Sequence, residues 1–268
     1  MIRPKKSLGQ NYLIDKNVIK KILDLTHIKE NNIVEIGPGT GNLTDEIIKI
    51  KPKNLLLVEK DDQLCDLLIK KHSQNTIIKI FNEDILNFAL ENKMIDKSIV
   101  IGNLPYNIST QILVKLIKFK EWPPNYKRVI FMFQKEVAEK ILAKEKTSKY
   151  GRITVISNWR LKVVNHFHVS KNCFFPKPKI DSTVVVFEPI TNNKYKINNI
   201  SNLELITRVL FSNKRKMINK SFSKLFKDSV SCAKKLNINL TYRPNQLSND
   251  EFYKITEKFE RLGVKISL

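Results

Sequence analysis

The sequence predicts an α/β protein, with a largely parallel, doubly wound sheet followed by a small, all-helical C-terminal part. Over the first 190 residues, short apolar runs typical of buried strands alternate with segments of helical periodicity, and the patterns beyond residue 191 are helical. The 268 residues suffice for one ample domain and a small one, and we place these domains at 1–190 and 191–268.

The elements follow one another in a regular order. The apolar runs predict strands near residues 33–36, 55–58, 76–81, 98–102, 128–133, 161–169 and 183–188. Helical patterns are visible at 42–50, 108–119 and 134–143, with room for two helices between 134 and 160. Further on, Ser248 and Glu251 have the spacing of a capping box, which predicts a helix to about residue 260.

A glycine-rich turn follows the first predicted strand. The run Gly37-Pro38-Gly39-Thr40-Gly41 separates this strand from a helix, as in nucleotide-binding units. A dinucleotide fingerprint, G-x-G-x-x-G, has its third glycine one residue later, where this chain has Asn42. The spacing therefore argues against NAD as the ligand.

Acidic residues follow the next two strands. Glu59 ends the strand at 55–58, where a carboxylate can accept hydrogen bonds from both hydroxyls of a ribose. Asp84 comes shortly after the strand at 76–81, and we expect it to accept a hydrogen bond from an adenine amino group.

The segment Asn103-Leu104-Pro105-Tyr106 has the features of a pocket for a planar amine. The Asn103 side chain offers a carbonyl oxygen, and the proline restricts Leu104 to an extended conformation that can aim its backbone carbonyl at the same amine. Tyr106 supplies an aromatic face on which a base can stack. This set suits an adenine whose exocyclic N6 is the nucleophile.

These segments resemble successive motifs of the rRNA adenine N6,N6-dimethyltransferase family. The resembling segments are residues 37–41, 58–61, 83–86 and 103–106, together with the opening segment 6–13. Residues 174–182 resemble the family's F-x-P-x-P-x-V-x-S loop, with Ile180 in place of valine, and residues 211–219 and 243–247 resemble its helical domain. The resemblance spans nearly the whole chain.

The resemblance implies a Rossmann-like class I methyltransferase sheet with S-adenosyl-L-methionine as methyl donor. It implies cofactor contacts from Asn11, Leu13, Gly37, Glu59, Asp84 and Asn103. It also implies that Phe174 closes on the face of the adenine opposite Tyr106. The expected activity is dimethylation of N6 of two adjacent adenosines near the 3′ end of 16S rRNA, late in assembly of the 30S subunit.

The net charge of +22 is compatible with a nucleic-acid partner. Residues 191–268 carry +10 of it, so this part is about twice as basic per residue as the rest. Lys214, Arg215 and Lys216, followed by Lys220, Lys224 and Lys227, have spacings that place several cations on one face of a helix. Such a face either binds a phosphate backbone or is simply solvated.

Other features limit the alternatives. Cys65, Cys173 and Cys232 are far apart and lack C-x-x-C spacing, which argues against disulfides and zinc. We expect His166 and His168 to be exposed on one face of a strand rather than to bind a metal. With no apolar region after the basic start and no membrane-spanning run, we expect a cytoplasmic protein. We also expect it to be a monomer.

Two other functions remain open. One is a related large-subunit rRNA methyltransferase, which usually has isoleucine in place of Leu104 and lacks close matches to the segments at Lys214 and Arg243. The other is a non-catalytic, RNA-binding assembly factor of the same fold. The intact segment from Asn103 to Tyr106 and the presence of Glu59 count against the second.

Overall fold

The computed structural model describes residues 4–5 and 9–263. The chain forms two compact units: Met1–Ala138 with Lys162–Pro189, and Glu139–Leu161 with Ile190–Leu268. The predicted ranges 1–190 and 191–268 therefore need a correction, because residues 139–161 belong to the second unit. Tyr150, Val155 and Trp159 are buried in its core, so this segment packs with the C-terminal helices.

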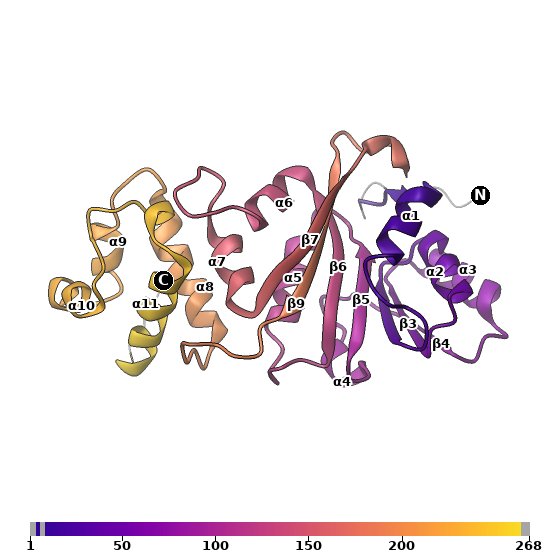
Figure 1. Cartoon of the computed structure of the whole chain (residues 1–268), viewed down its shortest axis with the longest axis horizontal. Coiled ribbons are helices and arrows are strands. Elements are labelled where there is room, and N and C mark those ends of the chain that lie inside the picture. The colour runs from indigo at the N-terminus through magenta and orange to yellow at the C-terminus, as the bar shows by residue number, and fades with distance from the viewer. Residues whose placement is uncertain (1–3, 6–8, 264–268) are drawn as a thin grey trace. The chain divides into compact units, whose positions relative to one another are not determined.

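The first unit is built on a seven-stranded sheet (Figure 1). Its strands are β2 (Asn32–Ile36), β3 (Asn54–Glu59), β4 (Ile78–Asn82), β5 (Ser98–Asn103), β6 (Tyr126–Gln134), β7 (Leu161–Val169) and β9 (Ser182–Pro189). Their order is β4-β3-β2-β5-β6-β9-β7, with parallel pairing from β4 to β6 and antiparallel pairing of β6 with β9. The predicted strands and the largely parallel sheet are confirmed.

The central strands form because both of their faces are covered. In β5, Ile99, Val100 and Ile101 are each at most 1% exposed, so neighbouring residues on opposite faces are all buried. One face packs against α1 (Lys16–Leu23) and α2 (Asn42–Lys49), whose apolar residues join the strands in a single core. Continuous apolar runs are what a parallel sheet buried on both faces requires.

The remaining helices have at most 13 residues. In the first unit they are α3 (Asp62–His72), α4 (Leu90–Lys93) and α5 (Ser109–Ile117), and α6 (Lys135–Ile141) runs from the first unit into the second. In the second unit they are α7 (Arg152–Arg160), α8 (Ile200–Leu210), α9 (Asn219–Ser223), α10 (Ser229–Leu236) and α11 (Asn249–Arg261). Among them, α3, α8, α10 and α11 are capped at their N-termini by side chains. The predicted capping box is present: Ser248 Oγ accepts from the Glu251 amide at 3.2 Å, and Glu251 accepts from the Ser248 amide at 2.7 Å.

The predicted helical face of cations is wrong, because α9 ends at Ser223: only Lys220 lies within it, and Lys224 and Lys227 follow its last residue. Lys214, Arg215 and Lys216 lie in the turn between the 3-10 helix η3 (Phe211–Asn213) and α9, so they do not share a helix with Lys220. All three are exposed, and the Ile218 amide donates to the Tyr242 carbonyl at 2.8 Å. This bond joins the segment at 214–218 to the one containing Arg243.

A second, two-stranded sheet was not predicted. β1 (Tyr12–Leu13) pairs antiparallel with β8 (Phe174–Phe175), and Tyr12 lies opposite Phe175. This pairing holds the N-terminal segment against the loop that precedes β9.

His166 and His168 on β7 are both exposed, as predicted. Cys65 and Cys232 are buried, whereas Cys173 is partly exposed. Among residues 4–5 and 9–263, no helix has the length and apolar character needed to cross a membrane.

The strand order determines where a ligand can bind. β3 and β4 lie on one side of β2, whereas β5 and β6 lie on the other, so the order reverses between β2 and β5. At such a switch point, the connections that leave the carboxyl ends of the two strands diverge and leave a crevice. Gly37 follows β2 and Asn103 ends β5, which brings the two main predicted motifs to this crevice.

Candidate functional site

A pocket of about 270 Å³ lies at the carboxyl ends of the parallel strands. Eight of the nine predicted site residues line it, namely Asn11, Leu13, Gly37, Glu59, Asp84, Asn103, Leu104 and Tyr106. Phe174 is the exception. The structure therefore brings together segments that are up to about ninety residues apart in the sequence.

The turn after β2 requires glycine. Gly37, Gly39 and Gly41 have φ values of 68°, 60° and 82°, a region that other residues rarely adopt. A Cβ at Gly39 would also lie 3.0 Å from Cδ1 of Tyr12, so the tyrosine ring would have to shift to make room for it. The turn can therefore bring its backbone close to both the N-terminal segment and a ligand.

Glu59 anchors this turn. Its two carboxylate oxygens accept from the Gly39 amide at 3.0 Å and from the Asp61 amide at 2.9 Å. The residue is 7% exposed, and burial raises the pKa of its carboxyl above the ordinary value. Since each carboxylate oxygen can accept a second hydrogen bond, Glu59 is still able to bind ribose hydroxyls.

Asp84 is held in place by a cation and a backbone amide. Its Oδ2 accepts from Lys60 Nζ at 2.7 Å, and its Oδ1 accepts from the Leu86 amide at 2.9 Å. The hydrogen bond from Lys60 is the main reason why the pKa of the Asp84 carboxyl lies below its ordinary value. Lys115 Nζ donates to the Leu86 carbonyl at 2.9 Å and steadies the same turn. Asp84 is thus an ionised acceptor at the pocket wall.

The orientation of the Asn103 side chain is set by the N-terminal segment. Its Nδ2 donates to the Asn11 backbone carbonyl at 2.8 Å. Because the amide nitrogen is used in this way, Oδ1 is left as the acceptor that Asn103 can offer to a ligand. The sequence predicts such an acceptor at Asn103, and its contact with an amine stays a prediction.

Gly102 permits the tight packing that ends β5. A Cβ there would lie 2.6 Å from Leu104 Cδ2 and 2.9 Å from the Ile36 carbonyl oxygen. The Leu104 side chain is itself only 2% exposed. Leu104 therefore anchors the segment through its side chain, which leaves its backbone as the part that can serve a ligand.

Tyr106 is fixed through its hydroxyl group. This hydroxyl lies 2.6 Å from Ser182 Oγ, at the start of β9, and the Ser182 residue is fully buried. Burial raises the pKa of the tyrosine hydroxyl, so it stays protonated. A ring held at its far end has a defined position, and its face can stack on a base.

Phe174 does not have the surroundings that its predicted role requires. It is 3% exposed and belongs to the core formed by α1, α2 and the sheet. The neighbouring Phe175 is 56% exposed, because successive side chains of β8 point in opposite directions. In this structure the aromatic ring available at the surface is Phe175, and the Phe174 ring is covered by the core.

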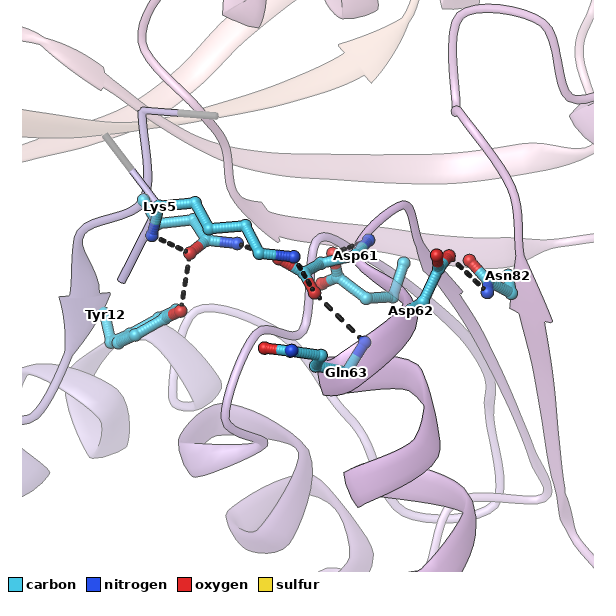
Figure 2. Close-up of polar contacts among 8 residues, drawn as sticks. Lys5, Tyr12, Asp61, Asp62, Gln63 and Asn82 are labelled. Carbon is cyan, nitrogen blue, oxygen red and sulfur yellow. Dashed lines mark hydrogen bonds and ion pairs between the residues drawn. The ribbon is translucent and has the colours of Figure 1, made fainter. Parts of the chain in front are cut away.

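The N-terminal segment is fastened by a polar network that the sequence did not reveal (Figure 2). The Asp61 carboxylate accepts from Lys5 Nζ at 2.9 Å and from Gln10 Nε2 at 3.0 Å, while it also caps α3. The Tyr12 hydroxyl donates to Gln10 Oε1 at 2.8 Å. Residues 6–8 of the predicted opening motif lie outside the described residues.

Asn42, which replaces the third glycine of a dinucleotide motif, has a role in the same arrangement. Its Nδ2 donates to the Leu13 backbone carbonyl at 2.8 Å. The N-terminal segment is thus hydrogen-bonded on one side to α2 and on the other to Asn103. Both bonds use backbone carbonyls, which explains why side-chain patterns in the segment gave no sign of them.

Glu35 is a buried acid at the pocket that the prediction also missed. It is 2% exposed, and its Oε2 accepts from Thr44 Oγ1 at 2.7 Å. Burial is the main cause that raises the pKa of its carboxyl to about 8. An acidic residue within an otherwise apolar strand was the signal available in the sequence.

The raised pKa of Glu35 predicts how stability depends on pH. The folded protein keeps a proton on this carboxyl up to about pH 8, whereas the unfolded chain releases it near pH 4.5, so stability falls as pH rises between these values. The free energy of unfolding of the parent, relative to that of Glu35→Gln, should fall by up to ~1.4 kcal/mol per pH unit. Urea denaturation of both proteins from pH 5 to pH 8 measures this difference. Equal slopes would show that Glu35 is ionised in the folded protein.

Comparisons with known proteins identify the family. The family model described as "Ribosomal RNA adenine dimethylase" matches residues 1–261. A relative from Pelagibacter ubique, named "Ribosomal RNA small subunit methyltransferase A", is 44% identical over 261 residues, which are 97% of this chain and 98% of the relative. A protein of the same name from Wolbachia sp. subsp. Drosophila simulans is 35% identical over 99% of this chain and 97% of its own length.

Two solved structures have the same fold. A dimethyladenosine transferase from Plasmodium falciparum is 26% identical, with a TM-score of 0.79 over 94% of this chain and 98% of that one. The 23S rRNA methyltransferase ErmE is 20% identical, with a TM-score of 0.66 over 93% and 99% of the two chains, which shows a shared fold. With a family match across almost the whole sequence, this chain belongs to the ribosomal RNA adenine dimethylase family.

Proposed function

We propose that this protein dimethylates N6 of two adjacent adenosines near the 3′ end of 16S rRNA, during late assembly of the 30S subunit. The observation that carries this proposal is the oriented Asn103 side chain, whose amide nitrogen is bonded to Asn11 while its oxygen is left for a ligand. The names of the relatives support the small-subunit substrate. The cell compartment is then the cytoplasm, and the protein acts as a monomer.

The pocket fits S-adenosylmethionine as the methyl donor. Glu59 presents a buried carboxylate suited to the two ribose hydroxyls, and Asp84 an ionised acceptor suited to the adenine amino group. Gly37, Asn11 and Leu13 line the same cavity. When bound there, the cofactor supplies an electrophilic methyl group on a sulfonium.

Asn103, Leu104 and Tyr106 orient the target base. Asn103 Oδ1 and the Leu104 carbonyl accept the two hydrogens of the amine and thereby hold its lone pair out of conjugation with the ring. Tyr106 stacks on one face of the adenine, which must leave its helix or loop to enter. The amine loses its proton to water after transfer, so the reaction depends on orientation and electrostatics rather than on an acid or base.

The second transfer places a further requirement on the pocket. A monomethylated amine has one hydrogen left, so one of the two acceptors must tolerate a methyl group in place of a hydrogen bond. The spent cofactor must also exchange between the two rounds.

The alternative of a large-subunit substrate is less well supported. Leu104 differs from the isoleucine usual in that group, and the resemblance to ErmE, at 20% identity, is one of fold. For a non-catalytic factor, nothing would require the Asn11–Asn103 hydrogen bond that leaves Oδ1 available.

Mapping of N6-methylated adenosines in total rRNA tests the proposal directly. Cells that lack the gene should lose methylation at two adjacent adenosines near the 3′ end of 16S rRNA, and the parental gene should restore it. Restored methylation in 23S rRNA instead would identify the large-subunit enzyme. An rRNA pattern that does not change with the gene would favour the non-catalytic factor.

We also propose that the second unit binds RNA through the exposed segment at Lys214, Arg215 and Lys216. Lys214 Nζ lies 5.7 Å from the centre of the Phe211 ring, and a Cβ at Gly151 would be 3.2 Å from the same nitrogen. The hydrogen bond from Ile218 to Tyr242 places the segment containing Arg243 next to it. Several cations thus share one exposed surface of the unit.

Changing Lys214, Arg215 and Lys216 together to glutamine should weaken substrate binding and flatten its dependence on salt. Each lost phosphate contact should reduce the slope of log affinity against log salt by about one. Binding to undermethylated small subunits at several salt concentrations measures this slope, and cofactor affinity should not change. A slope equal to that of the parent would show that these residues form a solvated surface.

A further inference from the structure

The loop of residues 176–181 is tied to the pocket at both ends. Phe175, which precedes it, pairs with Tyr12, and Ser182, which follows it, is hydrogen-bonded to the Tyr106 hydroxyl at 2.6 Å. Both tyrosines line the pocket. The loop therefore begins and ends next to residues that line the pocket, and one of them, Tyr106, is the residue on which we propose that the target adenine stacks.

The loop and its neighbours expose an unusual set of side chains for the surface of a protein. Phe175 is 56% exposed and Ile180 41%, and Ile14 is 51% exposed with its amide bonded to the Cys173 carbonyl at 2.9 Å. Lys177 and Lys179 on the same loop are exposed, and no acidic side chain of the described residues forms an ion pair with either. An exposed aromatic ring is thus followed, two and four residues later in the sequence, by two exposed cations.

The acid nearest in sequence is engaged elsewhere. Asp181 Oδ1 accepts from the Lys171 backbone amide at 3.0 Å, and the Asp181 carbonyl accepts from the Lys135 amide at 3.0 Å. Asp181 therefore fastens the end of the loop to its own unit. The charge that the loop offers to a partner comes from its lysines.

We propose that Phe175 is a stacking site for an unpaired RNA base adjacent to the target adenosine, and that Lys177 and Lys179 bind the phosphates of the same strand. This inference rests on the proposed function. An exposed ring with neighbouring cations is the combination by which proteins hold single-stranded nucleic acid. The site would hold the flanking nucleotide, whereas Asn103 and Tyr106 hold the reacting base.

The variants separate the aromatic face from the apolar volume. Phe175→Leu keeps an apolar side chain without a ring, Phe175→Ala removes both, and Phe175→Trp keeps a face for stacking. Ile69→Ala is the matched control, since Ile69 on α3 is also exposed, at 48%. For the lysines, Lys177→Gln with Lys179→Gln is compared with the exposed pair Lys70→Gln with Lys79→Gln.

Single-turnover methylation of undermethylated small subunits is measured over a range of subunit concentrations with saturating cofactor. Phe175→Ala should raise the subunit concentration that gives the half-maximal rate by about 5- to 150-fold, the range expected for loss of one stacked base, and leave the maximal rate near that of the parent. Phe175→Leu should lose most of this affinity as well, whereas Phe175→Trp should bind the subunit about as tightly as the parent does. The double lysine variant should reduce the salt slope by about two.

A protein-free RNA hairpin with the sequence of the 16S 3′ end, carrying 2-aminopurine beside the target adenosine, gives a second readout. Its fluorescence should be quenched by the parent and by Phe175→Trp, and much less by Phe175→Leu. The inference is overturned if Phe175→Leu binds the substrate as tightly as the parent does, or if Ile69→Ala loses as much affinity as Phe175→Ala. It is also overturned if the variants lose affinity for small subunits but not for the hairpin, which would indicate that Phe175 contacts a protein. If the parent methylates neither the small subunits nor the hairpin, the proposed function itself is contradicted, whatever the Phe175 variants bind.

Discussion

Asn103→Ala should lower the turnover of methylation on the order of 10²-fold or more, because it removes an acceptor that is oriented before the base arrives. The alanine variant also leaves the Asn11 carbonyl without its partner, so cofactor affinity should fall and the assay uses a saturating cofactor concentration. Single-turnover methylation of undermethylated small subunits at saturating cofactor isolates the chemical step.

Variants of Tyr106 serve as the comparison. Tyr106→Ala should cost about 1–3 kcal/mol of stacking, whereas Tyr106→Phe should retain most activity because the ring face remains. The phenylalanine loses the hydrogen bond to Ser182, so Ser182→Ala is the matched control for that bond alone. If Asn103→Ala methylates at the parental rate, the amine pocket is misassigned and the non-catalytic assembly factor becomes the better hypothesis.

Glu59→Ala should weaken binding of S-adenosylmethionine on the order of 10²-fold or more, since hydrogen bonds to a charged group are worth about 1.5–3 kcal/mol each and the residue is proposed to accept two. The change removes the proposed ribose acceptor and also leaves the buried amides of Gly39 and Asp61 without their partner. Calorimetry with the cofactor measures the loss.

Glu59→Gln is the matched variant, because it keeps the shape and one oxygen acceptor, and it should show a smaller loss. RNA binding should be nearly the same in all three proteins, since it depends on phosphate contacts made by other residues. Unchanged cofactor affinity in Glu59→Ala would remove this residue from the site.

Strand positions were predictable because each central strand is buried on both faces. The apolar runs at 33–36 and 98–102 are short and rich in β-branched residues, and the structure begins and ends these strands within a residue of the prediction. The glycine turn and Asn103 were found for a similar reason, since a backbone with positive φ and a side chain at a strand end are local features.

Features that depend on distant partners were missed. β1 and β8 are two residues each and lie about 160 residues apart, so no local pattern could reveal their pairing or the burial of Phe174. The cationic spacing from Lys214 onward suggested a helix, but it does not show that the chain turns at residue 214 before α9 begins. Residues 139–161 read as part of the first domain because sequence order does not show which core a helix enters.

The hydrogen bond from Asn103 to the Asn11 carbonyl has a thermodynamic consequence for a reaction in two rounds. In the proposed roles, Asn11 contacts the cofactor and Asn103 contacts the amine. A ligand bound at either residue therefore stabilises the hydrogen bond between them, and with it the site of the other ligand. Linkage requires this cooperativity to be reciprocal: the factor by which cofactor tightens RNA binding equals the factor by which RNA tightens cofactor binding. Departure of the spent cofactor then loosens the hold on the monomethylated base, at the stage when its amine has to rotate to present its remaining hydrogen.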